Sequence, residues 1–390
     1  MKILIAHNYY LQSGGEDIVF DAEASLLEAH GHQVSKIYMD NSIIRDISSI
    51  EVGIRTIWNS KGYQFIRKNI EGFQPDIIHF HNTFPLISPA GYEAAFDCNI
   101  PVVQTLHNYR LLCLNATLMR NGKVCELCVE KTPPLPGIKY KCYHDGFLPS
   151  AAIASMLTIH RLRKTFEKRV NSYIVLSGFA KELFVKAGLP QEKIYIKPNF
   201  VSELPVQSNS EINEKYLLFV GRLSEEKGIL SLLEAAKLSN VPLKIAGTGP
   251  LEEDITRFIQ KNGLEYCEFI GKVPRDEVFP LMRNALAVVI PSLWFEGFPM
   301  VIAEAFSQGT AMIASNLGVM QELMNESDCG LGFPPGNAAE LAKQLMLAWN
   351  NPEQMIVKGE NAKRMFEDKF SAETNYANLM HIYHETINNA

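Results

Sequence analysis

Two glutamates bracket a short turn in the second half of the chain. Glu296 and Glu304 stand on either side of Gly297-Phe298-Pro299, and the apolar run that follows predicts a helix beginning at this turn. Pro299 suits a first helical position, because the N–H that proline lacks would be unpaired there anyway. The free N–H groups of a first helical turn favour a phosphate. Glu304, about a turn and a half further on, would accept hydrogen bonds from paired hydroxyls such as those of a ribose. Glu296 would lie near the reacting end of such a ligand, so the pattern is typical of a nucleotide-sugar site.

Two positive charges follow an earlier strand in the same half. The predicted strand Tyr216–Val220 runs into a loop, Gly221–Gly228, in which Arg222 and Lys227 stand five residues apart near a helix start. A sugar diphosphate develops negative charge as it departs, and fixed cations with helix N–H groups stabilise that charge without a metal. An exposed turn with ordinary surface charges would show the same residues, so this loop alone does not decide the function.

Four further loops follow strands of the same pattern. Gly14-Gly15 precedes a helix that should begin near Glu16, and His107 ends the strand Val102–Leu106. In the second half, Gly247-Thr248-Gly249 would let backbone approach a ligand, and Val273 could present its backbone to a base edge. Each of these features is by itself more typical of a structural turn than of a binding site.

Composition limits the classes of protein to consider. A chain of 390 residues exceeds one ordinary core, and 47% hydrophobic residues support two well-buried domains. A net charge of −6 disfavours a nucleic-acid partner. The apolar run after Met1 is too short for a signal peptide and predicts a buried strand. We therefore expect a cytoplasmic protein with mostly reduced cysteines.

Short apolar runs alternate with helix-length amphipathic segments, which predicts parallel sheets covered by helices on both faces. The predicted strands are Lys2–Ala6, Gln33–Tyr38, Asp76–Phe80, Val102–Leu106, Ser172–Leu176, Lys193–Ile196, Tyr216–Val220, Leu243–Ala246, Glu268–Ile270, Ala287–Ile290 and Ala311–Ala314. The predicted helices include Glu16–His30, Pro89–Phe96, Ala151–Val170, Phe179–Ala187 and Ala372–Asn388. The polar segment 201–214 reads as a linker. We expect Rossmann-like domains over residues 1–200 and 201–370, facing each other across a cleft that holds the ligand.

Taken together and in order, these motifs resemble one family. Gly-Gly-Glu after the first strand, Gly-Arg-Leu-x-x-x-Lys-Gly, Gly-x-Gly-Pro, Gly-x-Val and Glu-Gly-Phe-Pro-x-x-x-x-Glu are similar to those of the family-4 glycosyltransferases. The resemblance covers nearly the whole chain, and its second-half motifs are specific as a set. It implies the GT-B fold, in which residues 371–390 would form a last helix that crosses back onto the first domain. Residues 1–200 would then hold the acceptor and residues 201–370 the donor.

The resemblance also implies roles for individual residues. Arg222 and Lys227 would hold the donor diphosphate, and Glu304 would bind the ribose hydroxyls. His107 would lie beside the donor sugar. The remaining donor contacts would come from Glu296, the backbone of Gly297, Phe298, Pro299 and Met300, the backbone of Val273, and Gly15.

The implied reaction is the transfer of a hexose-type sugar with retention of configuration. The sugar would move from a nucleotide-sugar, a UDP- or GDP-sugar above all, to a hydroxyl of a glycan or lipid-linked acceptor in polysaccharide or glycoconjugate synthesis. Attack from the same face, with the departing phosphate as base, is the mechanism ascribed to the family. No Asp-x-Asp motif stands near the donor loops, so neither a catalytic metal nor an organic cofactor is expected. A nucleotide-sugar epimerase and a non-catalytic nucleotide-sugar-binding homologue remain alternatives.

Four cysteines cluster in an insert at about 108–148 that follows His107. Cys125 and Cys128 have the C-x2-C spacing of half a structural zinc site, and Cys113 and Cys142 could complete four ligands. A metal would order a segment that has little apolar periodicity. Zinc, an iron–sulfur cluster and four reduced thiols all remain open.

Basic residues interrupt the apolar segment Ala151–Val170. A basic amphipathic helix can lie on an anionic membrane, where a lipid-linked acceptor would be found, and this would place the protein peripherally on the inner face. A helix packed on its own domain with one solvated basic face is the simpler interpretation.

Overall fold

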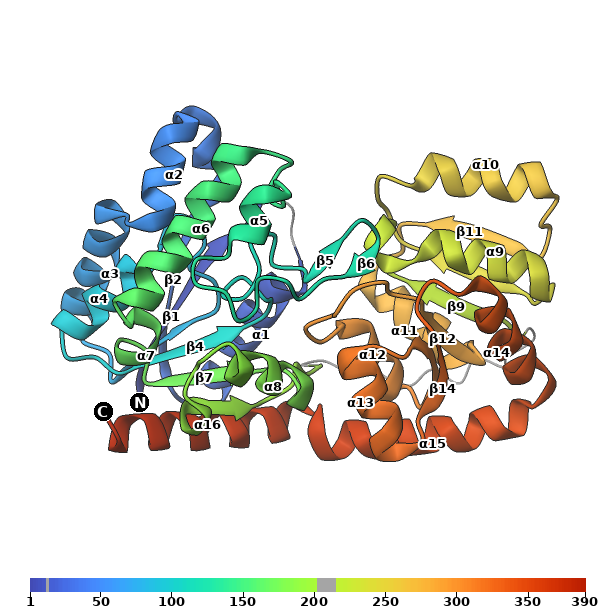
Figure 1. The fold of residues 1–390 in the computed structure, drawn as a ribbon. Helices are drawn as coiled ribbons and strands as arrows, with labels where there is room; N and C mark the ends of the chain where they lie inside the picture. The colour runs from blue at the N-terminus through green and yellow to red at the C-terminus, as the bar shows by residue number, and fades with distance from the viewer. Residues whose placement is uncertain (12–13, 202–214) are drawn as a thin grey trace. The chain divides into compact units, whose positions relative to one another are not determined.

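The computed structural model describes residues 1–11, 14–201 and 215–390, which form two compact units. The first unit comprises Met1–Leu118, Cys125–Asn199 and Ala372–Ala390 (Figure 1). The second comprises Met119–Val124 and Phe200–Ser371. Most of the predicted linker 201–214 lies outside the described residues.

A parallel six-stranded sheet forms the centre of the first unit within the described residues, in the order β2-β1-β3-β4-β7-β8. Strands β3 and β4 are buried throughout, as expected of strands covered on both faces. The strands are β1 (Lys2–Tyr9), β2 (Gln33–Asp40), β3 (Ile77–Phe80), β4 (Val102–Leu106), β7 (Ser172–Val175) and β8 (Ile194–Ile196). A short hairpin, β5 (Met119–Arg120) with β6 (Lys123–Val124), belongs to the second unit.

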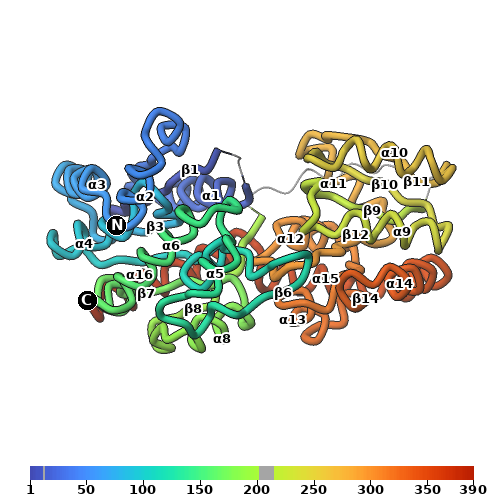
Figure 2. The backbone as a smooth tube through the Cα atoms, turned by 45° about the horizontal axis from the view of Figure 1, so that its top comes forward, coloured from blue at the N-terminus to red at the C-terminus, as the bar shows by residue number. Residues whose placement is uncertain are grey.

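The helices of the first unit pack around this sheet (Figure 2). They are α1 (Gly15–Ala29), α2 (Ser49–Ile57), α3 (Ser60–Phe73), α4 (Ala90–Asp97), α5 (Leu135–Lys139), α6 (Phe147–Leu162), α7 (Thr165–Lys168), α8 (Gly178–Lys186) and α16 (Ala372–Asn388). The single helix predicted over Ala151–Val170 is wrong, because Lys164 takes a left-handed φ of 56° and separates α6 from α7. Helix α16 buries Leu379, Ile382 and Tyr383 in the core that contains Ile3 and Ile5 of β1.

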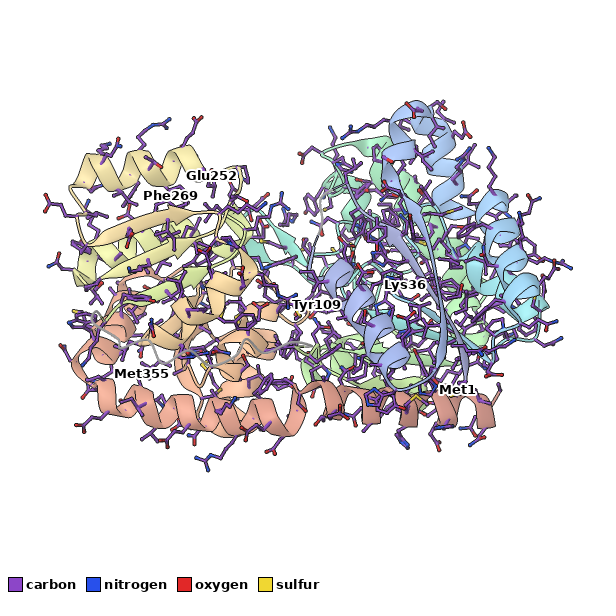
Figure 3. The ribbon with its side chains drawn as sticks, turned by 180° about the vertical axis from the view of Figure 1, so that it is seen from behind. Met1, Lys36, Tyr109, Glu252, Phe269 and Met355 are labelled. Carbon is purple, nitrogen blue, oxygen red and sulfur yellow. The ribbon has the colours of Figure 1, made fainter. Side chains whose placement is uncertain are left out.

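The second unit has the same plan. Its parallel sheet of six strands, counted in the described residues, has the order β11-β10-β9-β12-β13-β14. The strands are β9 (Leu217–Val220), β10 (Leu243–Ala246), β11 (Cys267–Gly271), β12 (Ala287–Ile290), β13 (Met312–Ser315) and β14 (Gly330–Phe333). The helices are α9 (Ile229–Ser239), α10 (Glu252–Asn262), α11 (Arg275–Asn284), α12 (Met300–Ser307), α13 (Gly318–Ser327), α14 (Ala338–Asn350) and α15 (Pro352–Lys369). Met355, labelled on α15 in Figure 3, belongs to the buried core of this unit.

In each sheet, the loops that follow the strands therefore lie at one edge. Because all neighbouring strands within a sheet are parallel, their carboxyl ends meet at the same edge. In the first unit this edge carries the residues after β1, β3 and β4. In the second unit it carries the loops after β9, β10, β11 and β12.

Candidate functional site

The loops after β9 and β12 meet through an ion pair in the second unit. Lys227 Nζ lies 2.7 Å from Glu296 Oε1, and Ser292 Oγ donates to the same oxygen at 2.7 Å. The Lys227 ammonium also lies 5.6 Å from the centre of the Trp294 ring, within cation–π range. The structure thus brings together two predicted donor-site residues, and it adds Ser292 and Trp294, which sequence reasoning missed.

Backbone contacts hold these two loops together. The Leu293 N–H donates to the carbonyl of Glu226 at 2.8 Å. Gly228 has a φ of 71°, and a Cβ at this position would lie 1.8 Å from the Pro291 carbonyl oxygen. Only glycine combines this φ with so close an approach. Gly228 therefore permits the contact that places Lys227 beside Glu296.

Helix α12 begins one residue later than the sequence suggested. Pro299 is the N-cap, with extended backbone, and Met300 is the first helical residue. The prediction of a first helical proline is wrong by one position, but proline still costs no helical N–H there. Pro299 is buried and Gly297 and Met300 are half-buried, whereas Phe298 is 6% exposed and packs edge-on against Phe370 at 5.0 Å. The Phe298 side chain is therefore part of the core, and only its backbone could serve a ligand.

Glu304 lies on α12 beside a cation from the neighbouring helix. Its Oε1 is 3.5 Å from Nη2 of Arg275, the first residue of α11. Burial raises the pKa of Glu304, and the Arg275 charge opposes that rise. Val273 lies half-buried two residues before Arg275. The loop after β11 thus brings both Val273 and a charge partner for Glu304 to this edge.

Arg222 and the glycines after β10 have different surroundings. Arg222 is exposed. The Gly247-Thr248-Gly249 loop was expected to approach a ligand, but Cβ atoms at Gly247 and Gly249 would lie 1.8 Å from the carbonyl oxygen of Gly221 and 2.4 Å from that of Leu223. These two glycines therefore make room for the neighbouring loop, and the expected approach of a ligand to their backbone stays a prediction.

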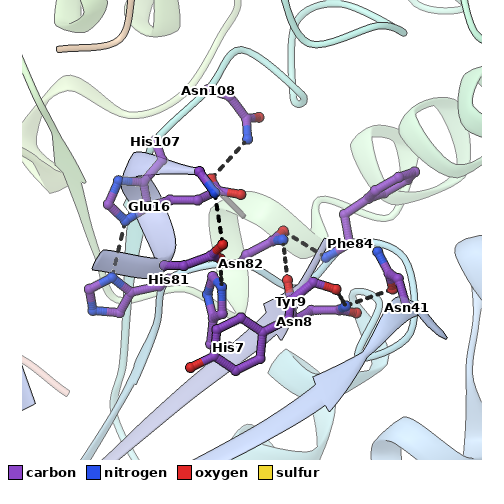
Figure 4. A network of polar contacts seen from close by, with 12 residues as sticks. His7, Asn8, Tyr9, Glu16, Asn41, His81, Asn82, Phe84, His107 and Asn108 are labelled. Carbon is purple, nitrogen blue, oxygen red and sulfur yellow. Dashed lines mark hydrogen bonds and ion pairs between the residues drawn. The ribbon is translucent and has the colours of Figure 1, made fainter. Parts of the chain in front are cut away.

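In the first unit His107 follows β4 and contacts a second histidine. His107 Nε2 lies 3.0 Å from Nδ1 of His81, which follows β3 (Figure 4). Burial and the nearby His81 hold the pKa of His107 well below its ordinary value. His107 is accordingly a neutral imidazole that is partly open to solvent.

The start of α1 lies at the same edge. Gly15 is exposed and begins the helix, while the Gly14 N–H donates to Oδ2 of Asp17 at 2.9 Å. Asp17 also accepts from Nε2 of His7 at 2.7 Å. Ser13, which precedes the two glycines, lies outside the described residues.

Glu16 is a further acid at this edge, half-buried, to which the sequence analysis gave no role. Asn108 Nδ2 lies 3.4 Å from Glu16 Oε2, and Oε1 is buried without a hydrogen bond. Burial, reinforced by the charge of Asp17, raises the pKa of Glu16 from 4.5 to about 8. The sequence signals were its place beside Gly15 and its membership of the Gly-Gly-Glu motif.

The four clustered cysteines do not form a compact ligand set. All are free thiols, and Cys113 and Cys128 are buried. Burial, with the neighbouring Cys113, raises the pKa of the Cys128 thiol to about 11. Among the described residues, the set whose ligand atoms all lie within 4.8 Å of one another is Glu23, His79 and His81. Zinc at the cysteines therefore stays a prediction.

The basic residues of α6 and α7 are largely engaged within the first unit. Arg161 donates to the Leu111 carbonyl at 2.5 Å, Arg169 pairs with Glu93 at 2.7 Å, and His160 bonds the Ile57 carbonyl. Within the described residues, no helix combines the length and apolarity needed to cross a membrane.

Comparisons with known proteins identify the family. Residues 14–203 match Glycosyltransferase Family 4, and residues 201–365 match Glycosyl transferases group 1. An uncharacterized glycosyltransferase of Methanocaldococcus jannaschii is 30% identical over 317 residues, which cover 79% of this chain and 75% of that protein. This chain belongs to the family-4 glycosyltransferases. The O-antigen chain mannosyltransferase C of Escherichia coli is 30% identical over 193 residues, 47% of this chain and about half, 52%, of that protein.

Solved structures share the GT-B fold of this chain. The Anabaena protein HepE in complex with UDP has a TM-score of 0.70 at 18% identity, over 99% of this chain and 100% of that one. The same protein in complex with UDP-glucose has a TM-score of 0.68. The predicted fold class and family are therefore confirmed.

Proposed function

We propose that this glycosyltransferase moves a sugar from a nucleoside-diphosphate sugar to a hydroxyl of a glycan or lipid-linked acceptor, with retention of configuration. The observation that carries the proposal is the Lys227–Glu296 pair beside the start of α12. It puts a cation, a carboxylate and the N-terminus of a helix at one end of the second sheet. The titles of the HepE structures, which name UDP and UDP-glucose, support this class of donor.

Each residue then has a chemical task. Lys227 and Arg222 stabilise the charge that the leaving diphosphate develops, and the first N–H groups of α12 contribute to the same end. Glu304 accepts hydrogen bonds from the ribose hydroxyls. Glu296 binds hydroxyls of the donor sugar once the diphosphate competes for Lys227. These groups supply the electrostatic stabilisation without a catalytic metal.

Retention follows if the acceptor attacks the face that the phosphate leaves. The departing phosphate oxygen then takes the acceptor proton, so no second carboxylate at nucleophile spacing is needed. His107 would lie beside the sugar, and the partly buried Glu16 and Asn108 would face the acceptor. The acceptor belongs to cell-surface polysaccharide or glycoconjugate synthesis in this proposal.

A thermal-shift screen with UDP-, GDP- and ADP-sugars tests the donor site first, because binding to the native state raises the melting temperature. The nucleotide that shifts it is then used for transfer to a lipid-linked or oligosaccharide acceptor, with the anomeric proton of the product read by NMR. An inverted product would contradict retention. Conversion of the donor sugar without an acceptor would indicate an epimerase, and no shift with any donor would indicate a non-catalytic homologue.

A further inference from the structure

A line of buried side chains runs from α1 to His107. Behind His107, the Nε2 atom of His81 lies 3.3 Å from Oε2 of Glu23, and Glu23 Oε1 accepts a hydrogen bond from Lys197 Nζ. Glu23 is 0% exposed, Lys197 1% and His81 2%. The line therefore joins four elements of the first unit, namely α1 and the segments that follow β3, β4 and β8.

The charges of the neighbouring groups determine the protonation states of Glu23 and His81. Burial disfavours an ionised Glu23, but Lys197 and the neighbouring histidines outweigh it and hold its pKa well below the ordinary value. Glu23 is therefore a carboxylate, which only accepts hydrogen bonds. Burial lowers the pKa of His81, so this ring is neutral and has a single N–H. That proton belongs on Nε2, which lies beside the Glu23 carboxylate. A lone pair on Nε2 would be repelled by the negative carboxylate oxygen.

The same reasoning extends one residue outward. With its proton on Nε2, His81 presents a bare Nδ1 to His107 at 3.0 Å. This contact requires one proton between the two nitrogens, and His107 Nε2 must supply it. Which nitrogen of a histidine is protonated is commonly set by the partner of the other one.

We propose that Glu23 and His81 are positioning residues that fix His107 in the tautomer with its proton on Nε2 and a lone pair on Nδ1. His107 then acts through Nδ1 as a hydrogen-bond acceptor. This step rests on the proposed function: Nδ1 of His107 accepts a hydrogen bond from a hydroxyl of the donor sugar. In this tautomer Nδ1 cannot donate a proton to the leaving phosphate.

A metal ion explains the same cluster less well. Glu23, His79 and His81 bring their ligand atoms within 4.8 Å of one another. However, the Lys197 ammonium already neutralises Glu23, and Nδ1 of His79 lies 2.8 Å from the Tyr383 hydroxyl. A divalent cation would have to lie beside this buried ammonium, where repulsion between like charges is strong. The Lys197 ammonium therefore already balances the charge of Glu23 without a metal ion.

NMR of the free full-length protein tests the tautomer without any substrate. With histidine labelled by ¹⁵N, two-bond ¹H–¹⁵N correlations distinguish the two neutral tautomers and the imidazolium. His107→Gln assigns the signals of His107 by their loss. We expect the Nε2–H form at pH 7.5. An Nδ1–H form, or an even mixture, overturns the proposal even if neither of the His81 variants described next folds.

Two variants of His81 separate positioning from packing. His81→Asn keeps an oxygen acceptor near the former Nδ1 and should retain the Nε2–H form of His107. His81→Leu removes the acceptor and should populate both tautomers; an unchanged His107 spectrum in His81→Leu overturns the proposal. With UDP-glucose as donor, His81→Leu should lower kcat by about tenfold or more with little change in donor KM, and His81→Asn should recover most of it.

Failure of the proposed function would give a different pattern. A protein that shows the Nε2–H tautomer of His107, with the expected response to both variants, but neither binds nor turns over UDP-, GDP- or ADP-sugars sustains the tautomer assignment and removes the transferase role. If the protein turns over one of these donors but His107 carries its proton on Nδ1, the transferase function stands and the tautomer assignment is refuted.

Discussion

A side chain at Gly228 would collide with the carbonyl oxygen of Pro291, since a Cβ built there lies 1.8 Å from that atom. The contact joins the loop that carries Lys227 to the loop that carries Glu296. The spacing of the charged residues Lys227 and Glu296 thus depends on one residue without a side chain. If these two residues bind the donor as we propose, a change in the packing of the two loops will also change donor binding.

Gly228→Ala should therefore lose both stability and donor binding. The left-handed backbone costs alanine about 1–2 kcal/mol, and overpacking adds roughly 1–3 kcal/mol. Gly263→Ala is the matched control, because Gly263 also has a positive φ, 61°, but has open space around its Cβ position. Urea denaturation and nucleotide calorimetry measure the two effects. Equal losses in both variants would show that the contact with Pro291 is unimportant.

Arg222→Ala should separate turnover from stability. Arg222 is exposed, so its removal should change the free energy of unfolding by less than about 0.5 kcal/mol. Loss of one group that stabilises the leaving diphosphate should lower kcat on the order of 10²–10³-fold. Arg257→Ala, at a 69% exposed side chain on α10, is the control for loss of a surface charge. Release of nucleoside diphosphate follows the rate, and a near wild-type kcat would remove Arg222 from the mechanism.

The parallel sheets were predictable because their strands are short apolar runs, and such runs in a sequence directly indicate buried strands. β4, β10 and β12 begin and end at the predicted residues. Helices α2 and α3 were missed although they are amphipathic, because few of their residues are buried: Thr56 in α2, and Gly62, Ile66 and Ile70 in α3. Strand β14 was missed because Gly330 and Gly332 hide its apolar character.

Residues of the candidate site were predictable where a charged residue lies next to a predicted helix start. Contacts that depend on how separate loops pack together were not predictable. Lys227 and Glu296 were found from their motifs, but their 2.7 Å contact depends on how two loops meet. The sequence also could not show that a Cβ at Gly247 would collide with the carbonyl oxygen of Gly221, because that contact joins two separate loops. Glu23 was missed because an acid on a helix ordinarily faces solvent, and only its pairing with Lys197, 174 residues away, explains its burial.

The cysteine insert gives a prediction about metal removal. If Cys113, Cys125, Cys128 and Cys142 bind zinc, protein purified without chelator should contain about one zinc per chain, and EDTA should lower its melting temperature. Cys125→Ser should abolish metal binding. Cys98→Ser, a half-buried free thiol outside the insert, should leave it unchanged. Elemental analysis that finds no metal would leave four reduced thiols as the structure of this segment.

Glu16 should make stability depend on pH in a specific direction. Its pKa rises from 4.5 to about 8 on folding, so the native state holds a proton that the unfolded chain has lost between these values. The stability that this proton provides is fully present below about pH 4.5 and is lost as pH rises through 8. The groups that act on Glu16 are Asp17, which reinforces the rise, and Asn108 and Arg110, which oppose it.

Glu16→Gln removes this titration while keeping the size of the side chain. The variant should melt at nearly the wild-type temperature at pH 5 and at a higher temperature than wild type at pH 9. Glu28→Gln, at an exposed position on the same helix, should show no such trend. The measurement is a series of thermal melts from pH 5 to 9 at constant ionic strength. A difference that stays constant with pH would mean that Glu16 is ionised in the folded protein, and the expected contact of a neutral carboxyl group with the acceptor would then be wrong.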